Sequence, residues 1–198
     1  MSQRVGVVLA GGLSRRLGRA KGELAFAGET LARRAADAVW PLCASVLISV
    51  GPEAENPAPG FSLVRDRPPR GRGPLAGIDA AFRITGDADL LVLACDYPRV
   101  GADLLRLIVR TSEEEEQDDI VMPVDPRGRD HPLVALWRRS TAAVVAEAVQ
   151  EERLKVQALL ADCRVRRLGP RLFPGLDAGR VLLNLNRPAD LETLRAGG

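Results

Sequence analysis

The residues of this chain that are best suited to chemistry lie in a glycine-rich, basic stretch near its N-terminus. Gly11 and Gly12 follow an apolar run, and basic side chains come next at Arg15, Arg16, Arg19 and Lys21. Because glycine has no Cβ, its backbone can approach a ligand closely and turn its N–H groups toward an anion. Arginine adds planar donors for a phosphate, and lysine neutralises it as a mobile point charge. The stretch therefore predicts a phosphate-binding loop, with a solvated basic turn as the alternative.

Two common phosphate-binding loops do not match this stretch. The dinucleotide fingerprint requires G-x-G-x-x-G, which residues 11–16 do not supply. The P-loop requires G-x-x-x-x-G-K-[ST], but here Gly18 is separated from Lys21, and Gly22 follows the lysine. Neither of these two patterns therefore fits the stretch.

A second candidate for chemistry is Asp96, which lies just beyond the apolar run 89–94. A carboxylate buried there would be costly unless it met a cation. Mg²⁺ prefers oxygen ligands and is commonly held by one or two carboxylates together with waters and substrate phosphates, so a single aspartate is sufficient. The position predicts a magnesium ligand, with a cap for the helix expected from Gly101 as the alternative.

A third candidate, Asp66, follows the short apolar run 61–64 and precedes the basic, Pro- and Gly-rich segment 68–74. A carboxylate can accept hydrogen bonds from both N1–H and N2–H₂ of guanine, which offers a route to base selectivity. Contact with a ribose or a metal is equally open. Segment 68–74 leads into a helix N-terminus, where an anion is favoured, or it is a plain surface connection.

These candidates must be positioned by strands and helices that alternate along the chain. Apolar, β-branched runs predict strands, and apolar residues at helical spacing predict helices. The strands are expected at 5–10, 46–50, 61–64, 89–94, 120–123, 131–137, 165–168 and 181–184. The helices are expected at 31–39, 75–82, 101–111, 140–152, 154–160 and from Pro188 onward, with Thr30 and Ser140 as N-caps. This alternation predicts a three-layer α/β/α sandwich with a mostly parallel sheet.

Two polar segments are predicted to connect these elements. Residues 125–130 form a polar turn, after which the chain returns as a strand, so a hairpin-like excursion is expected. The acidic run 113–119 is interpreted as a solvated helix end or loop rather than a metal cluster, because contiguous like charges splay outward.

Length and composition bound the class of protein. The chain has 198 residues, which suits one α/β domain over 1–198. Its net charge of +2 gives no electrostatic case for binding nucleic acid or a membrane surface. Cys43, Cys95 and Cys163 are widely spaced and odd in number, which argues against a disulfide framework or a zinc site and favours a reducing, cytoplasmic location.

Five blocks of the sequence together resemble the molybdenum cofactor guanylyltransferase family, that is, the molybdopterin-guanine dinucleotide biosynthesis protein A family of the nucleotidyltransferase superfamily. The first block, 9–21, reads LAGG-x-S-x-RLG-x-x-K. The others are GPLAGI at 73–78, CD-x-P at 95–98, HPL-x-AL at 131–136 and NLNRP-x-DL at 184–191. The resemblance extends over nearly the whole chain. LAGG is its guanylyl form, whereas related cytidylyl and other nucleotidyl enzymes more often have LAAG.

The resemblance implies a Rossmann-like fold of the nucleotide-diphospho-sugar transferase type. It implies transfer of GMP from GTP to the terminal phosphate of a molybdopterin-type molybdenum cofactor, with release of pyrophosphate, and contact with other cofactor-biosynthesis proteins or molybdoenzyme chaperones. It implies catalytic roles for Arg16, Lys21 and Asp96, a Mg²⁺ ion held by Asp96 with Asn186, and acceptor binding by His131, Asn184 and Asn186. The nucleotide-binding residues that it implies are Leu9, Ala10, Gly11, Gly12, Lys21, Ser49, Asp66, Gly77 and Asp96.

The sequence departs from the family pattern at positions that bear on base choice. Ser49 stands where the family has an asparagine, and Ala20 stands where an acidic residue often precedes the lysine. Two alternatives therefore stay open: cytidylyl or other nucleotidyl transfer to a different phosphorylated acceptor, and a non-catalytic carrier of nucleotide or cofactor. Gly12 and Ser49 are the positions that discriminate guanylyl transfer from the first alternative. Lys21 and Asp96 together speak against the second, because binding alone needs no metal ligand.

Overall fold

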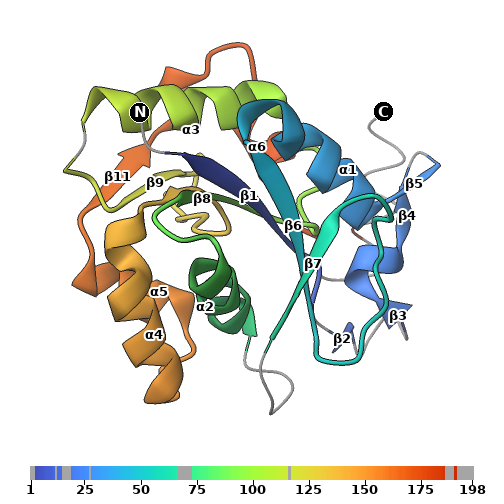
Figure 1. The fold of residues 1–198 in the computed structure, drawn as a ribbon. Coiled ribbons are helices and arrows are strands. Elements are labelled where there is room, and N and C mark those ends of the chain that lie inside the picture. The colour runs from blue at the N-terminus through green and yellow to red at the C-terminus, as the bar shows by residue number, and fades with distance from the viewer. Residues whose placement is uncertain are drawn as a thin grey trace.

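The computed structural model describes residues 3–11, 13–14, 19–26, 28–66, 73–115, 117–185 and 190. In this described part of the chain, seven strands form the central sheet, in the order β11-β9-β10-β8-β1-β6-β7 (Figure 1). The strands are β1 (Arg4–Leu9), β6 (Ser45–Val50), β7 (Ser62–Arg65), β8 (Asp89–Ala94), β9 (Ile120–Pro123), β10 (Val134–Trp137) and β11 (Val165–Leu168). β10 is antiparallel to both of its neighbours, and the other pairings are parallel. The predicted mostly parallel sheet is confirmed.

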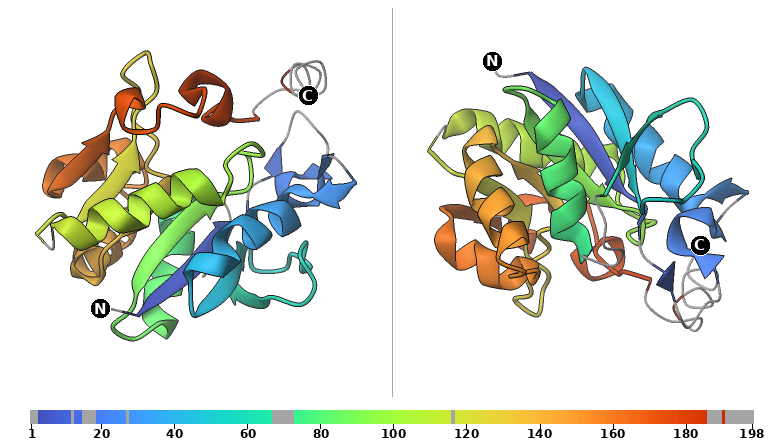
Figure 2. Two further views of the ribbon diagram at one scale, coloured as in Figure 1. Left: turned by 90° about the horizontal axis from the view of Figure 1, so that it is seen from above. Right: turned by 60° about the horizontal axis from the view of Figure 1, so that its bottom comes forward.

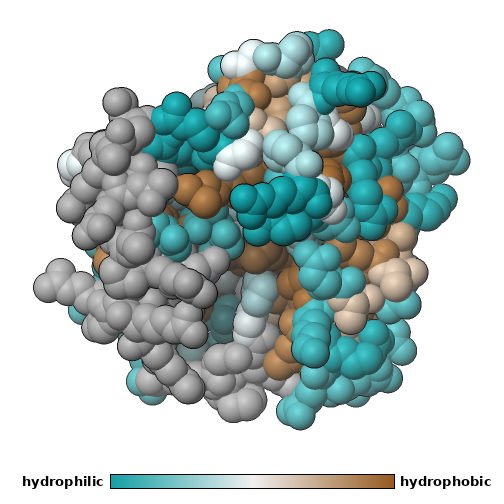
Figure 3. All heavy atoms as spheres, turned by 180° about the vertical axis from the view of Figure 1, so that it is seen from behind, coloured by the Kyte–Doolittle hydropathy of each residue, from teal (hydrophilic) through white to brown (hydrophobic). Residues whose placement is uncertain are grey.

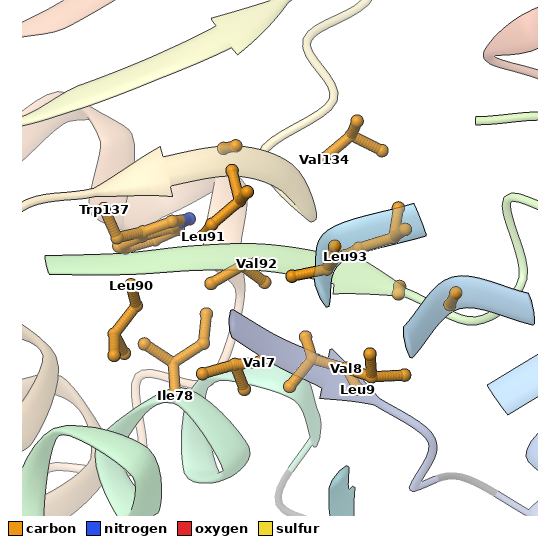
Figure 4. Packing of buried hydrophobic residues seen from close by; sticks show 14 of the residues in the cluster. Val7, Val8, Leu9, Ile78, Leu90, Leu91, Val92, Leu93, Val134 and Trp137 are labelled. Carbon is orange, nitrogen blue, oxygen red and sulfur yellow. The ribbon is translucent and has the colours of Figure 1, made fainter. Parts of the chain in front are cut away.

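The middle of the sheet is built from the two strands without a polar face. β1 pairs in parallel with β8, with Val7 opposite Val92, and the residues of β8 are buried throughout. Figure 4 shows their side chains packed together with Ile78 and with Trp137 of the neighbouring strand β10. Burial of apolar area on both faces is the main force that holds these strands at the centre.

Helices cover both faces of the sheet, which gives the predicted three layers. α1 (Leu31–Val39) and α3 (Ala102–Glu114) lie on one face, and α2 (Gly73–Ile84), α4 (Ala142–Gln150) and α5 (Val156–Leu159) lie on the other (Figures 1 and 2). α1 begins as expected, because the Oγ1 atom of Thr30 accepts a hydrogen bond of 3.1 Å from the Arg33 amide. Within the described residues, no helix is long and apolar enough to cross a membrane.

The chain between β1 and α1 contains short elements that the sequence did not predict. β2 (Leu13–Ser14) pairs with β3 (Arg19–Ala20), and β4 (Ala25–Phe26) pairs with β5 (Glu29–Thr30), both antiparallel. A short 3-10 helix, η1 (Lys21–Glu23), lies between the two pairs. The remaining 3-10 turns of the described chain are η2 (Trp40–Leu42), η3 (Arg139–Thr141), η4 (Leu160–Asp162) and η5 (Pro170–Leu172).

Two local predictions are wrong. Residues 181–184 do not form a strand: α6 (Ala178–Val181) ends there, and the Asp177 carboxylate caps it by accepting from the Arg180 amide at 3.1 Å. Ser140 does not cap a helix, because its hydroxyl donates to Asp119 Oδ1 at 2.8 Å and α4 begins only after η3. The helix expected from Pro188 lies outside the described residues, apart from Asp190.

The acidic run 113–119 is only partly as predicted. α3 does end within it, at Glu114, but several of its carboxylates are paired rather than solvated. Asp118 accepts from Arg166 at 3.0 Å and Asp119 from Arg164 at 3.2 Å, so the run is tied to β11 and to the residue that precedes it. Arg164 and Arg166 offset the repulsion among these carboxylates, which the prediction from the sequence had expected to drive them into solvent. The hairpin between β9 and β10 is confirmed, with β10 beginning at Val134, three positions after His131.

Candidate active site

Three parallel strands end side by side and bring the predicted residues to one edge of the sheet. The pairing between β1 and β6 continues past the last strand residue, because the Ala10 amide donates to the Ser49 carbonyl at 2.9 Å. On the other side of β1, the Cys95 amide donates to the Leu9 carbonyl at 3.1 Å. Leu9, Ala10 and Gly11 therefore lie between Ser49 and the turn that carries Asp96. Open α/β sheets bind their ligands at such carboxyl ends of strands.

Ser49, Asp66 and Gly77 form one corner of this edge. Ser49 is 2% exposed, and its hydroxyl donates to Asp66 Oδ1 at 3.3 Å. A Cβ atom on Gly77 would lie 2.3 Å from Ser49 Oγ, so only glycine lets α2 pack this closely against the end of β6. Burial raises the pKa of Asp66 to about 6, although the hydrogen bond from Ser49 opposes the shift. The ionised carboxylate at this corner is therefore unfavourable unless a further hydrogen-bond donor stabilises it.

Asp96 lies in a tight turn directly after β8. The turn is closed by the Tyr97 amide, which donates to the Ala94 carbonyl at 3.2 Å, and Asp96 itself is half-buried with its Oδ1 atom shielded from solvent. The backbone carbonyl of Asp96 accepts a hydrogen bond of 2.7 Å from the Leu185 amide. This bond holds Asn184 next to the turn, while Asn186 lies outside the described residues.

The donor set at this turn fits a magnesium ion. A carboxylate and asparagine carbonyls are the hard oxygen ligands that Mg²⁺ prefers, and few protein ligands are needed when substrate phosphates supply the others. No cluster of three or more His, Cys, Asp or Glu side chains suited to a metal occurs among the residues that the structure describes. A metal at this edge would therefore depend on Asp96 and the segment beside it.

His131 is buried in a polar network behind Asp96. Its ring is 5% exposed, with Nδ1 at 3.1 Å from the Tyr97 hydroxyl and Nε2 at 3.7 Å from Asp125 Oδ2. Burial lowers the pKa of His131 despite the opposing charge of Asp125, so the imidazole is neutral at pH 7. Burial also opposes ionisation of Asp125, but hydrogen bonds from Arg129 and Arg127 lower its pKa to about 2. Both ring nitrogens of His131 face protein groups.

Sequence reasoning missed Tyr97 and Asp125 as members of this network. One signal was present, since the only tyrosine of the chain directly follows Asp96 and the only histidine begins the block at 131. What brings them together is the return of β10 alongside β8, where the Ala94 amide donates to the Leu133 carbonyl at 2.8 Å. The contact depends on sheet order, which no local pattern encodes.

The described part of the predicted phosphate loop lies against the same strand ends. Gly22 of η1 is buried, and a Cβ atom on it would lie 3.0 Å from the Cβ of Ala10, so the backbone next to Lys21 passes close to the end of β1. Gly12 and Arg16 lie outside the described residues. Seen from behind in Figure 3, the surface is hollowed low in the centre, with apolar residues on the wall of the hollow.

A separate cavity of about 300 Å³ lies between α2 and α4. Its walls include Ala76, Ala80 and Ala146, and its charged group Asp79 is paired with Arg83 at 2.8 Å. None of the predicted site residues lines it. The strand-end site is therefore defined by its converging polar groups and not by the size of this cavity.

Comparison with known proteins identifies the family of the chain. The family model of the MobA-like NTP transferase domain matches residues 6–167. The chain belongs to this family. A probable molybdenum cofactor guanylyltransferase from Pelotomaculum thermopropionicum is 33% identical to the MobA-like chain. The match covers 98% of the MobA-like chain and 93% of the relative. The molybdenum cofactor guanylyltransferase of Rhizobium johnstonii is 31% identical, and the match covers 98% of the MobA-like chain and 96% of the relative.

Solved structures of similar shape support the fold. The crystal structure of molybdopterin-guanine dinucleotide biosynthesis protein A from Archaeoglobus fulgidus is 23% identical, covers 98% of the MobA-like chain and 100% of its own, and has a TM-score of 0.80. A CMP:2-keto-3-deoxy-manno-octonic acid synthetase, solved with CTP, reaches a TM-score of 0.75 at 16% identity, covering 98% of each chain. The predicted resemblance, the Rossmann-like fold and the enzyme class, a nucleotidyltransferase, are confirmed.

Proposed function

We propose that this chain transfers GMP from GTP to the terminal phosphate of a molybdopterin-type molybdenum cofactor and releases pyrophosphate. The observation that carries the proposal is the convergence of three features at one sheet edge: the end of β1, the Ser49–Asp66 corner and the Asp96 turn. The curated relatives named guanylyltransferases, which match nearly the whole chain, support the choice of GTP and molybdopterin as substrates.

The reaction exchanges one phosphorus–oxygen bond for another. An oxygen of the acceptor phosphate attacks the α-phosphorus of GTP, and the bond from that phosphorus to the α,β-bridging oxygen breaks. The electron pair of the broken bond leaves with pyrophosphate. No protein base is required, because the second pKa of a phosphate monoester is about 6 and the nucleophile is largely ionised at neutral pH.

The nucleotide is bound across the ends of β1 and β6 in this proposal. The backbone of residues 9–12 approaches the nucleotide, and Arg16 and Lys21 neutralise the triphosphate. The Asp66 carboxylate accepts from the guanine donors, with Ser49 orienting it and Gly77 leaving room for that hydrogen bond. These contacts hold the α-phosphorus in line for attack.

Asp96, together with Asn186, would hold Mg²⁺ at the Asp96 turn. The ion, when bound, offsets charge that develops on the phosphate oxygens. In this proposal Asn184 and Asn186 face the acceptor. The Leu185 amide, which donates to the Asp96 carbonyl, supports this assignment for Asn184. His131 serves the acceptor side from its buried position by fixing the turn between β8 and α3 through Tyr97.

The proposal also covers the surroundings of the reaction. Cys43, Cys95 and Cys163 form no disulfide bond among the described residues, which suits a reducing cytoplasm. Because the cofactor must arrive and leave, contact with other cofactor-biosynthesis proteins or with molybdoenzyme chaperones is part of the proposed function.

The variant Asp96→Asn tests the proposal, because it removes one charge and keeps the size of the side chain. We expect kcat for acceptor-dependent pyrophosphate release from GTP to fall at least about a hundredfold, with the melting temperature little changed. Asp103→Asn is the matched control, since that carboxylate is 81% exposed and pairs with Arg106 in α3. A kcat for Asp96→Asn equal to that of the control would remove Asp96 from the site.

A further inference from the structure

One arginine of α1 contacts both halves of the site. The Nε–H group of Arg34 donates to the Pro98 carbonyl at 2.7 Å, and its guanidinium carbon lies 5.4 Å from the centre of the Phe26 ring. Pro98 belongs to the chain that directly follows Asp96, and Phe26 belongs to β4, which follows η1 and Lys21. Arg34 therefore links the Asp96 turn to the hairpin of β4 and β5, which follows the phosphate loop in the chain.

On the Asp96 side, the contact fixes a pair of consecutive turns. The first turn is closed between Ala94 and Tyr97, and the second by the Val100 amide, which donates to the Tyr97 carbonyl at 3.1 Å. Pro98 lies inside the second turn, is buried and has no N–H group of its own. The bond from Arg34 therefore anchors this segment through its carbonyl, two residues from the Asp96 side chain.

On the loop side, the contact adds a side-chain link to a backbone link. The Leu31 amide at the start of α1 donates to the Leu24 carbonyl at 2.8 Å, which fixes the chain just after η1. The stacking of Arg34 on Phe26 holds the hairpin of β4 and β5 against the same helix. Both links fix the chain directly after η1, the 3-10 helix that begins at Lys21.

We propose that Arg34 is a positioning residue that holds the phosphate loop and the Asp96 turn at a fixed separation, so that Lys21 and the magnesium ligand act on the same triphosphate. This inference rests on the proposed function, because it assigns Arg34 to that site. A planar guanidinium suits both contacts, since it donates through its Nε–H group while its cationic carbon lies over the Phe26 ring. Lysine would keep the charge and lose this combination.

Arg33 provides a matched control within the same turn of α1. Its guanidinium lies 5.3 Å from the centre of the Phe61 ring, and its Nη1 donates to the Pro59 carbonyl at 3.5 Å. It thus makes the same two types of contact, but toward the loop before β7 and on an exposed surface, where it also pairs with Asp37. Arg33→Ala removes the same chemical group without touching the site.

The test compares Arg34→Ala, Arg34→Lys and Arg33→Ala with the unaltered chain. For each protein we would measure the Kd of GTP in EDTA and in Mg²⁺, the melting temperature and kcat. The ratio of the Kd in EDTA to the Kd in Mg²⁺ reports how strongly the metal and phosphate contacts are coupled. A general loss of stability does not change this ratio. For Arg34→Ala we expect the ratio to fall about five- to tenfold and kcat about ten- to a hundredfold.

The two other variants complete the design. Arg33→Ala should keep the ratio and kcat within about twofold of the unaltered chain, because its partners lie outside the site. For Arg34→Lys we expect a Kd ratio and a kcat between those of Arg34→Ala and those of the unaltered chain. This variant carries the test if Arg34→Ala does not fold. Equal ratios in the Arg33 and Arg34 variants would overturn the inference. Failure of the unaltered chain to bind GTP would instead contradict the proposed function, and the same ratio would then be measured with the nucleotide that does bind.

Discussion

At the scale of single residues, the proposed function assigns the choice of base to Asp66. In this proposal its carboxylate accepts from both N1–H and N2–H₂ of guanine, whereas adenine offers no matching pair of donors. Loss of a charge-assisted contact typically costs about 1.5 to 3 kcal/mol, or roughly ten- to a hundredfold in affinity. We expect Asp66→Ala to weaken the binding of GTP by this amount and the binding of ATP much less, so that the two measured Kd values converge. Equal losses for both nucleotides would instead place Asp66 on the ribose or the metal.

The same residue gives a dependence of stability on pH. The pKa of Asp66 is about 6 in the folded protein and 3.8 ordinarily, so folding favours the protonated acid. Its stabilising contribution is fully present below about pH 4 and is lost as the pH rises through about 6. We expect Asp66→Asn to melt at a higher temperature than the unaltered chain at pH 7.5 and at nearly the same temperature at about pH 4. A difference that does not change with pH would contradict the raised pKa.

At the scale of elements, the site depends on how closely α2 approaches β1 and β6. In Gly77→Ala the new methyl group would meet Ser49 Oγ at 2.3 Å and Leu9 Cδ2 at 3.0 Å, so the helix or the serine must shift. We expect a loss of about 1 to 3 kcal/mol in the free energy of unfolding, together with weaker GTP binding, because Ser49 can no longer reach Asp66. Gly169→Ala is the control, since no atom of the described residues lies within 4 Å of its added Cβ. Unchanged GTP affinity in Gly77→Ala would show that this corner does not bind the nucleotide.

Elements whose signals are local could be predicted from the sequence. β1 and β8 follow from their continuous apolar runs, and α1 from Thr30 and the spacing of its apolar residues. Residues 181–184 could not, because Asp177 caps a short helix that ends within this strand-like run. The role of Ser140 could not be predicted either, because it depends on the carboxylate of Asp119, which directly precedes β9.

The candidate site divides in the same way. Glycines, charges and their order along the chain pointed to the end of β1, Asp66 and Asp96, which the sheet brings to one edge. The contacts of Arg34 with Pro98 and Phe26, and of His131 with Tyr97, join residues far apart in sequence. Such contacts are set by the order of strands and by which helix covers them, so no spacing in the sequence could predict them.

At the scale of the whole molecule, the prediction of one domain over 1–198 has a direct spectroscopic test. Trp137 is fully buried between β8 and β9, whereas Trp40 is 53% exposed at the end of α1. In Trp40→Phe the remaining tryptophan reports the sheet alone, and far-UV circular dichroism reports the helices around it. We expect the two urea transitions to coincide, as they do when a single domain unfolds cooperatively. Separate midpoints would divide the chain into independent units.

The most direct test of the account is the choice of nucleotide and acceptor. Purified protein would be incubated with Mg²⁺, molybdopterin and each of the four radiolabelled nucleoside triphosphates in turn, and pyrophosphate release would be followed with and without the acceptor. The account predicts release from GTP that depends on molybdopterin, with transfer of the labelled GMP to the acceptor. Preferential use of CTP, or equal release when a sugar phosphate replaces molybdopterin, would contradict it.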